Sequence, residues 1–314
     1  MGSFSWLASY PKSGNTWFRI VAANLYAEGN EPVDINDLPE RGGISSARTP
    51  FDNILLVDSD LLTHEECDRM RPMLYRAMAR EEEQQLADPM QLAEDKDRID
   101  GLVRMLKCHD AWTYTDLGEP LLGGREAARN AILIVRDPRD VAPSLANHND
   151  ITIDAAIDFM RNRESSYCGD PTHYSSQLRQ QLPGWSGHTG SWLDQRDIPV
   201  HLVRYEDMEA DPVETIQAAL SFAGRQVDRG DLARAVDLAS FDRLREQEAR
   251  SRFAEARPGR TFFRRGQSGG WRDDLADRQV ARIERDHAAM MDRLGYARSY
   301  SLADLEHILG ESDA

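Results

Sequence analysis

Residues 10–17 read Tyr-Pro-Lys-Ser-Gly-Asn-Thr-Trp, a glycine-containing turn between two segments of different periodicity. Residues 4–9 are short, aromatic-rich and half apolar, which predicts a strand. Residues 18–26 carry apolar side chains at helical spacing. A strand, a turn and a helix in this order place free backbone N–H groups and the positive end of the helix dipole at one point. The octet therefore predicts an anion-binding site, to which Lys12 adds a mobile charge.

The octet differs from the Walker A loop, G-x-x-x-x-G-K-[ST]. Its lysine, Lys12, precedes Gly14, and it has no second glycine. The hydroxyls of Ser13 and Thr16 nevertheless add hydrogen-bond donors to the same turn. The alternative is an ordinary strand-to-helix turn with a solvated lysine, and the octet alone does not exclude it.

A second segment places two basic side chains at the end of an apolar strand. Residues 104–112 read Arg-Met-Leu-Lys-Cys-His-Asp-Ala-Trp. Lys107 and His109 are two residues apart, so an extended chain points them to the same side. A lone histidine is more often a satisfied structural residue than a catalyst, so this segment alone leaves the role of His109 open.

A third segment repeats the strand–loop–helix pattern. Ala-Ile-Leu-Ile-Val at 131–135 predicts a buried parallel strand, and Arg136 follows it directly. Ser144 lies eight residues after Arg136, on the helix expected there. Because α/β proteins bind ligands at the carboxyl ends of parallel strands, we expect an anion site here too. An arginine at a strand end and a solvent-facing serine would be the structural alternative.

Residues 262–272 form a basic, glycine-rich loop between aromatic residues. Such a loop could be a flexible surface segment. Glycine, however, lets a backbone approach an anion closely, and arginine grips phosphate oxygens in bidentate fashion. Arg264, Arg265 and Gly266 are therefore candidate anion ligands.

Charge and cysteine content limit the class of partner. The 314 residues include 38 basic and 54 acidic ones, a formal net charge of −16, which argues against DNA or a heparin-type polyanion. The three cysteines, Cys67, Cys108 and Cys168, fit neither a disulfide framework nor a zinc site, so a reducing cytosol is favoured. We see no signal peptide and no membrane-spanning run, and expect a cytoplasmic protein without a nucleic-acid or membrane partner.

In chain order these motifs resemble those of the soluble, cytosolic-type sulfotransferases that use 3′-phosphoadenosine 5′-phosphosulfate (PAPS). The octet resembles the family's 5′-phosphosulfate loop, Y-P-K-S-G-T-x-W, and residues 136–144 match its 3′-phosphate motif, R-[ND]-x-x-D-x-x-x-S. Residues 264–271 resemble R-K-G-x-x-G-x-W, and residues 107–109 resemble the K-T-H strand. The resemblance spans residues 4–272, and the style of its motifs is closer to bacterial than to animal members.

The resemblance also implies roles for individual residues. His109 would be the general base, with Lys12 and Lys107 as the other catalytic residues. The implied cofactor-binding residues are Lys12, Ser13, Gly14, Asn15, Thr16, Trp17, Arg136, Ser144, Tyr205, Phe241, Arg264, Arg265 and Gly266. Asn15, Arg265 and Ala239 depart from the threonine, lysine and threonine usual in the family. PAPS would be the co-substrate and its desulfated product PAP the released nucleotide, with no metal, because cationic side chains carry the charge.

The implied fold is α/β: a single P-loop-like domain over residues 1–314, with a central, mostly parallel sheet flanked by helices. A helical and loop excursion at about residues 27–103 matches no family motif, and we expect it to help build the acceptor site. Within it we expect loop over 27–52 and a helix from 63 to about 86, broken or unbroken at Pro72. Later we expect a helix over 152–168 and an acidic tail after a last helix at 275–294.

The predicted reaction is transfer of a sulfuryl group from PAPS to a hydroxyl of a small-molecule acceptor. A P-loop kinase is the first alternative; it would need a Walker A lysine and a magnesium-binding strand end, for which Asp137 and Asp207 could be argued. A non-catalytic nucleotide-binding protein is the second. The sequence leaves the acceptor open among phenols, alcohols, sterols and natural-product scaffolds, and it leaves a homodimer open too.

Overall fold

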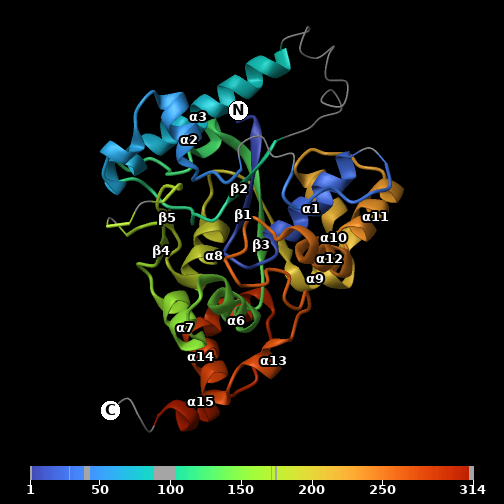
Figure 1. Cartoon of the computed structure of the whole chain (residues 1–314). Helices are drawn as coiled ribbons and strands as arrows, with labels where there is room; N and C mark the ends of the chain where they lie inside the picture. The colour runs from blue at the N-terminus through green and yellow to red at the C-terminus, as the bar shows by residue number, and fades with distance from the viewer. Residues whose placement is uncertain are drawn as a thin grey trace.

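The computed structural model describes residues 2–27, 29–38, 43–87, 104–170, 172–173 and 175–310. A sheet of four strands lies at the centre of the molecule, with helices on both sides (Figure 1). The strands, in the spatial order β2-β1-β3-β6, are β1 (Phe4–Ser9), β2 (Met105–Cys108), β3 (Ala128–Val135) and β6 (Val200–Arg204). Every neighbouring pair in this sheet is parallel, which confirms the predicted α/β class.

Alternating side chains of the central strands feed two separate cores. On β1, Trp6 packs into one apolar cluster and Leu7 into the other. On β3, Leu133 joins the cluster of Trp6, and Ile132 joins that of Leu7. Because successive residues of a strand point to opposite faces, a sheet covered on both sides needs near-continuous apolar strands. This need explains the uninterrupted aliphatic run that ends β3.

The described helices of eight or more residues cover the two faces of this sheet or, in the case of α15, pack on a helix that does so. They are α1 (Asn15–Tyr26), α2 (Arg48–Leu55), α3 (His64–Ala87), α6 (Pro138–Asn149), α7 (Ile153–Arg161), α8 (Gly184–Asp194), α10 (Pro212–Phe222), α11 (Arg229–Leu238), α12 (Phe241–Ser251), α14 (Asp277–Leu294) and α15 (Leu302–Leu309). Shorter helices are η1 (Ser59–Leu61), η2 (Gly124–Glu126), α9 (Tyr205–Ala210) and α13 (Trp271–Asp274). Helices α1, α10 and α11 contribute to the core around Leu7, whereas α3, α6, α7, α8 and α14 contribute to the core around Trp6 (Figure 1).

The long helix α3 is tied to the strand end that carries His109. Pro72 lies inside α3 without ending it. One turn of this helix presents Arg71, whose two terminal nitrogens lie 3.0 and 2.6 Å from the carboxylate oxygens of Asp110. Both side chains are fully buried. Losing one partner of a buried pair leaves an uncompensated charge, so this contact fixes α3 against the chain directly after β2.

Three expectations about elements were wrong. Residues 48–52, expected as loop, belong to α2, which the fully buried Phe51 holds in the core. The helix expected over 152–168 ends at Arg161, and Ser166–Tyr167 instead forms the short antiparallel pair β4–β5 with Gln180–Gln181. The acidic tail contains α15, which packs against α14.

The excursion at 27–103 is described only in part. Residue 28 and residues 39–42 and 88–103 lie outside the described residues, so the expected contribution of these parts to an acceptor site is not described. No helix in the described ranges is long and apolar enough to cross a membrane.

Candidate active site

The parallel strands bring the predicted site residues to one edge of the sheet. The loops after β1, β2, β3 and β6 leave their strands at the same carboxyl edge, where ligands bind in open α/β sheets. A cavity of about 490 Å³ lies there. Its lining includes these predicted residues: Lys12, Gly14, Asn15, Thr16, Trp17, Lys107, His109, Arg136, Ser144, Tyr205, Phe241, Arg264, Arg265 and Gly266.

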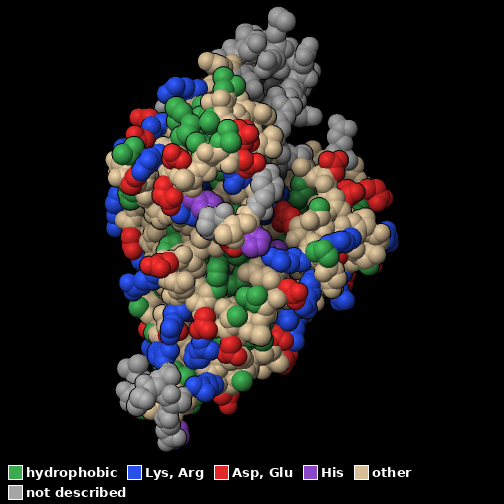
Figure 2. Space-filling view, turned by 60° about the vertical axis from the view of Figure 1, so that its left-hand side comes forward, with side chains coloured by type: hydrophobic (Ala, Val, Ile, Leu, Met, Phe, Trp, Pro, Cys, Tyr) green, Lys and Arg blue, Asp and Glu red, His purple; other side chains and the backbone are tan. Residues whose placement is uncertain are grey.

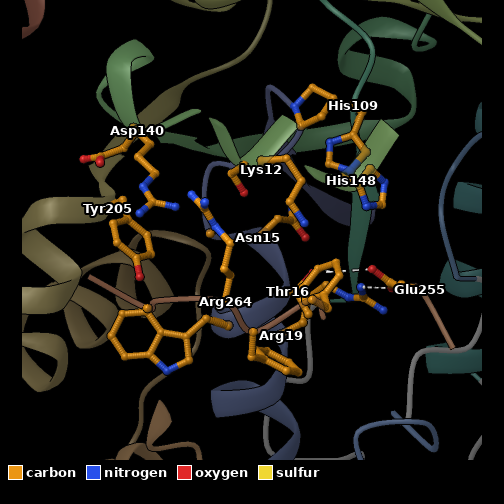
Figure 3. A pocket seen from close by; sticks show the side chains of 18 of the residues that line it. Lys12, Asn15, Thr16, Arg19, His109, Asp140, His148, Tyr205, Glu255 and Arg264 are labelled. Carbon is orange, nitrogen blue, oxygen red and sulfur yellow. Dashed lines mark hydrogen bonds and ion pairs between the residues drawn. The ribbon is translucent and has the colours of Figure 1, made fainter. Parts of the chain in front are cut away.

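Two ends of the cavity can be distinguished. Figure 3 shows His109 and His148 together at one end, and Asp140 and Tyr205 at the other, with Lys12 between them. Figure 2 shows histidine side chains near the middle of one face of the molecule, with Lys or Arg side chains beside them.

The turn before α1 depends on backbone conformations that favour glycine. Gly14 has a φ of 105°, and a Cβ placed on it would lie 2.5 Å from Cδ2 of Tyr205. Lys12 also has a positive φ, 69°, which L residues seldom adopt. The loop therefore turns sharply enough to aim the N-terminus of α1 into the cavity while its backbone lies directly against the Tyr205 ring.

Ser13 and Asn15 do not direct their donors into the cavity. The Ser13 side chain is buried, its Oγ has no hydrogen-bond partner, and the residue is absent from the cavity lining. The Asn15 amide donates to the Leu7 carbonyl at 3.0 Å and to Ser9 Oγ at 3.3 Å. Asn15 thus ties the turn back to β1, a role its amide fills where the family has threonine.

His109 is held in one tautomer. Its Nδ1 lies 2.8 Å from the Ser9 carbonyl oxygen, which can only accept, so Nδ1 carries the hydrogen and the lone pair is on Nε2. Burial, and then the nearby Lys107 charge, lower the pKa of His109 well below its ordinary 6.5. The imidazole is therefore neutral at physiological pH and can accept a proton at Nε2.

Lys12 is also set apart by its surroundings. Its Nζ lies 3.5 Å from the centroid of the Phe262 ring, a cation–π contact. Burial lowers the pKa of Lys12 to about 7, and the Lys107 and Arg136 charges act in the same direction, while Glu255 opposes them. Its ammonium is thus less stable than that of an ordinary surface lysine, and an anion bound nearby would restore it.

Lys107 forms part of a cluster that sequence analysis did not find. Glu255 lies 3.1 Å from Lys107 Nζ and 2.8 Å from Arg19 Nη1, and it accepts a hydrogen bond from Thr16 Oγ1 at 3.4 Å (Figure 3). The Lys107 and Arg19 charges and their hydrogen bonds outweigh burial and lower the pKa of Glu255 to about 2. The ionised Glu255 carboxylate therefore contacts two cations, Lys107 and Arg19, and the Thr16 hydroxyl.

Aromatic rings form the other end of the cavity. The Trp17 indole N–H donates to the carbonyl of Ala239 at 3.1 Å. Gly266 has a φ of 64°, and a Cβ there would lie 2.1 Å from the Phe241 ring. The guanidinium of Arg136 lies 4.1 Å from the centroid of Tyr205. Trp17, Phe241 and Tyr205 thus present ring surface to the cavity, as an aromatic base would require.

The predicted arginine pair is held by carboxylates of α13. Arg264 Nη2 lies 2.7 Å and Arg265 Nη2 2.9 Å from oxygens of Asp274. Asp140, at the start of α6, accepts the backbone N–H groups of Gly269 and Trp271 at 2.7 and 2.9 Å. These bonds fix the basic loop beside Arg136 and Ser144, which come from the segment that follows β3.

Sequence analysis missed several residues of the cavity wall, among them the charged or titratable Arg19, His148 and Glu255. Arg19 follows Thr16 by three residues on a helix, so spacing alone placed both on one face and could have found it. His148 follows Ser144 by four residues on α6 in the same way. Burial lowers the pKa of His148 to about 3, with Lys12 contributing. Nothing local marked Glu255, which lies in an irregular segment.

A parallel sheet with a strand–turn–helix unit and a neutral histidine at its carboxyl edge fits the class of P-loop-like α/β proteins. A family model described as "Sulfotransferase domain" matches residues 4–295. The chain therefore belongs to the sulfotransferase family.

Curated relatives are similar over most of their length. The chain is 24% identical to a flavonol 3-sulfotransferase of Flaveria bidentis, over 89% of this chain and 78% of that protein. It is 22% identical to a luciferin sulfotransferase of Photinus pyralis, over 88% of this chain and 69% of that protein.

One solved structure supports the fold. The chain is similar to mouse sulfotransferase SULT7A1 complexed with PAP, with a TM-score of 0.51 and 18% identity, over 97% of this chain and 88% of that one. At this identity the similarity shows a shared P-loop-like fold.

Proposed function

We propose that this protein transfers the sulfuryl group of PAPS to a hydroxyl of a small-molecule acceptor, giving a sulfate ester and PAP. Membership of the sulfotransferase family supports the reaction class. The single observation that carries the proposal within the site is the His109 tautomer. Its Nδ1–H donates to the Ser9 carbonyl, which leaves the basic lone pair on Nε2. His109 lines the same cavity as Lys12.

The cavity fits an anionic nucleotide in two respects. At one end, the Glu255 carboxylate accepts hydrogen bonds from Lys107, Arg19 and Thr16, which shows that these three groups can bind an anionic oxygen together. A carboxylate is a reasonable stand-in for a phosphate or sulfate oxygen, since both accept hydrogen bonds from the same donors. At the other end, the aromatic rings of Trp17 and Phe241 border the cavity. One end therefore suits the phosphosulfate and the other suits adenine.

We assign cofactor-binding roles on this basis. The N–H groups at the start of α1, from Gly14 to Thr16, would hold the 5′-phosphate with the helix dipole. Trp17, Phe241 and Tyr205 would border adenine. The 3′-phosphate would lie among Arg136, Ser144, Arg264, Arg265 and Gly266. Arg264 and Arg265 would then share their donors between this phosphate and the carboxylates of α13.

We assign catalytic roles to His109, Lys12 and Lys107. When bound, PAPS supplies the sulfuryl group and a nucleotide leaving group. His109 would accept the proton of the acceptor hydroxyl at Nε2, while its Nδ1–H stays on the Ser9 carbonyl. Lys12 would hold its proton at Nζ to neutralise charge on the bridging oxygen, and Lys107 would face the sulfuryl oxygens.

The kinase alternative is not favoured. Asp137, one of the two carboxylates that could be argued for a magnesium site, caps α6 by accepting the backbone N–H of Arg139 at 2.9 Å and pairs with the Arg139 guanidinium at 2.6 Å. In this structure both of its oxygens are engaged within the protein. The turn before α1 also lacks the lysine after glycine that a Walker A loop requires.

We propose that the acceptor enters at the His109 end, against part of the 27–103 excursion. Gly43 and Ile44 line the cavity, and the backbone N–H of Ser45 donates to the carbonyl of Lys107 at 2.9 Å. The excursion is thereby attached to the strand that leads into His109. We also propose a cytoplasmic location, where the free cysteines would stay reduced. A homodimer is a further proposal, and it rests on the sequence alone.

Calorimetric titration with PAP, compared with ADP and without magnesium, tests the proposed function. We expect PAP to bind with a dissociation constant in the micromolar range, about −8 kcal/mol, and ADP to bind at least tenfold more weakly, because ADP lacks the 3′-phosphate. Equal or tighter binding of ADP would contradict the assignment of Arg136, Arg264 and Arg265 to a 3′-phosphate and would favour the kinase.

A further inference from the structure

Glu255 is a carboxylate in the cationic part of the cavity. Its Oε1 lies 2.8 Å from Arg19 Nη1, and its Oε2 lies 3.1 Å from Lys107 Nζ and 3.4 Å from Thr16 Oγ1. The three partners come from α1 and β2, more than one hundred residues away in the sequence. Figure 3 shows the Glu255 carboxylate directed at Thr16 and Arg19.

These partners are the groups that a phosphosulfate needs. Thr16 belongs to the turn proposed for the 5′-phosphate, and Lys107 is proposed to face the sulfuryl oxygens. The Thr16 hydroxyl has a single hydrogen to donate, so it cannot serve the Glu255 carboxylate and an incoming anion at once. Two anions placed on these same three groups would also repel each other. One must replace the other.

The segment around Glu255 is arranged so that the side chain can leave while the backbone stays. The neighbouring Phe253 and Ala256 are buried, and the Ala254 N–H donates to Asn36 Oδ1 at 2.6 Å. The Glu255 side chain itself is 33% exposed. A rotation of its own torsion angles, without unfolding of the segment, is enough to carry the carboxylate towards solvent.

We propose that Glu255 is a displaceable counter-anion of the cofactor site: its carboxylate occupies Lys107, Arg19 and Thr16 in the free protein and is replaced there by the phosphosulfate when the cofactor binds. The inference rests on the proposed function, since it takes PAPS as the entering anion. It adds that Glu255 sets cofactor affinity by competition, and that Arg19 is a ligand of the same anion.

Competition between Glu255 and the cofactor predicts the direction in which removal of the Glu255 charge changes cofactor affinity. In the free protein the carboxylate stabilises two buried cations, and this stabilisation is lost when the cofactor displaces it. Removing the charge of Glu255 raises the energy of the free site and leaves the complex, in which Glu255 faces solvent, nearly unchanged. The cofactor should therefore bind more tightly to a Glu255→Gln variant than to the wild-type chain.

The experiment is calorimetric titration of the full chain with PAP and with adenosine 5′-phosphosulfate, which retains the phosphosulfate. For Glu255→Gln we expect about a tenfold lower dissociation constant for adenosine 5′-phosphosulfate, the scale of one charge-assisted hydrogen bond. We expect a smaller decrease for PAP, which lacks the sulfuryl oxygens proposed to face Lys107. Glu255→Asp keeps the charge on a shorter side chain that reaches the three donors less well, so it should give an intermediate constant.

Asp150→Asn is the matched control. Asp150, at the end of α6, pairs with Arg260 of the same 252–263 segment but does not line the cavity. Its φ is 57°, a conformation that asparagine tolerates. This variant loosens the segment without touching the cavity, so its nucleotide affinity should equal that of the wild type.

The outcomes separate the inference from the proposed function. If wild type binds PAP and Glu255→Gln binds it equally or more weakly, Glu255 is not displaced and the inference is wrong. If Asp150→Asn tightens binding as much as Glu255→Gln, mobility of the segment and not competition is the cause, and the inference is again wrong. If wild type binds neither PAP nor the phosphosulfate, the proposed function fails, and this inference fails with it.

Discussion

At the scale of single residues, the site depends on groups held by unusual local partners. The Ser9 carbonyl fixes the His109 tautomer, and Ser9 Oγ also receives the Asn15 amide. The last residue of β1 therefore connects the turn before α1 to the strand end that bears the histidine. The proposed general base and the turn proposed for the 5′-phosphate share this residue as an anchor, which keeps their separation constant.

We expect His109→Ala to abolish turnover and to preserve binding. Removing a general base costs about 10²–10⁴-fold in rate, whereas the proposed nucleotide ligands lie elsewhere in the cavity. The measurements are release of PAP from PAPS with a panel of phenols and alcohols, and calorimetric binding of PAP. Turnover within threefold of wild type would show that His109 is not the base.

At the scale of elements, β1, the turn and α1 form the unit that defines the site. The strand is fully buried, and the turn uses two positive φ angles in three residues, at Lys12 and Gly14. No side chain caps the N-terminus of α1. Its first backbone N–H groups thus lack the usual capping partner and remain available to an anion.

Gly14→Ala should destabilise this unit more than Gly29→Ala does. Both glycines have similar left-handed conformations, with φ of 105° and 95°, so each substitution costs about 1–2 kcal/mol in backbone strain. Only the Cβ of residue 14 collides, lying 2.5 Å from the Tyr205 ring, whereas no atom of the described residues lies within 4 Å of a Cβ at Gly29. We expect an additional loss of about 1–3 kcal/mol and weaker PAP binding for Gly14→Ala alone.

Urea denaturation and PAP titration of the two variants check this prediction. Equal destabilisation by the two substitutions would mean that the contact between Gly14 and Tyr205 contributes nothing beyond the backbone conformation.

At the scale of the whole molecule, two apolar cores on either side of the sheet enclose several titratable groups. His188 is fully buried, and burial lowers its pKa to about 3 against the opposing effect of the His109 and Asp110 backbone. Burial also lowers the pKa of His287, on α14, to about 4. Neutral imidazoles are thus built into the packed interior, where protonation is costly.

The stability of the protein should fall as the pH is lowered from 7.5 to 5.5. An unfolded histidine titrates near 6.5, so over this range the unfolded chain takes up protons that the folded protein does not. Each buried histidine of this kind should cost about 1 kcal/mol of unfolding free energy. His188→Phe should reduce the loss by about that amount.

Urea denaturation at pH 7.5 and 5.5 measures how the free energy of unfolding changes with pH, separately from any change in overall stability. If the free energy of unfolding of His188→Phe changes with pH as much as that of the wild type, the pKa of His188 is not lowered in the folded protein.

The sequence by itself determined the α/β class, because the strand, turn and helix around Lys12 and the aliphatic run at 131–135 are local patterns. It also determined which segments would meet, since parallel strands deliver their following loops to one edge. The sequence was less reliable where a tertiary contact decided the local structure. Burial of Phe51 made a helix of α2, and pairing with β5 made a strand of residues 166–167.

Only the tertiary structure decided which atoms face the cavity. It turned the Asn15 amide towards β1, buried Ser13 away from the lining and fixed His109 as the Nδ1–H tautomer. It also placed Glu255 on Lys107 and Arg19. A motif specifies residue types at fixed spacing along the chain, whereas that contact joins segments with no periodic relation. The physical reason is that a charge pair between distant segments forms only where the fold brings those segments together. The packing of the two cores decides that position, and no local sequence pattern does.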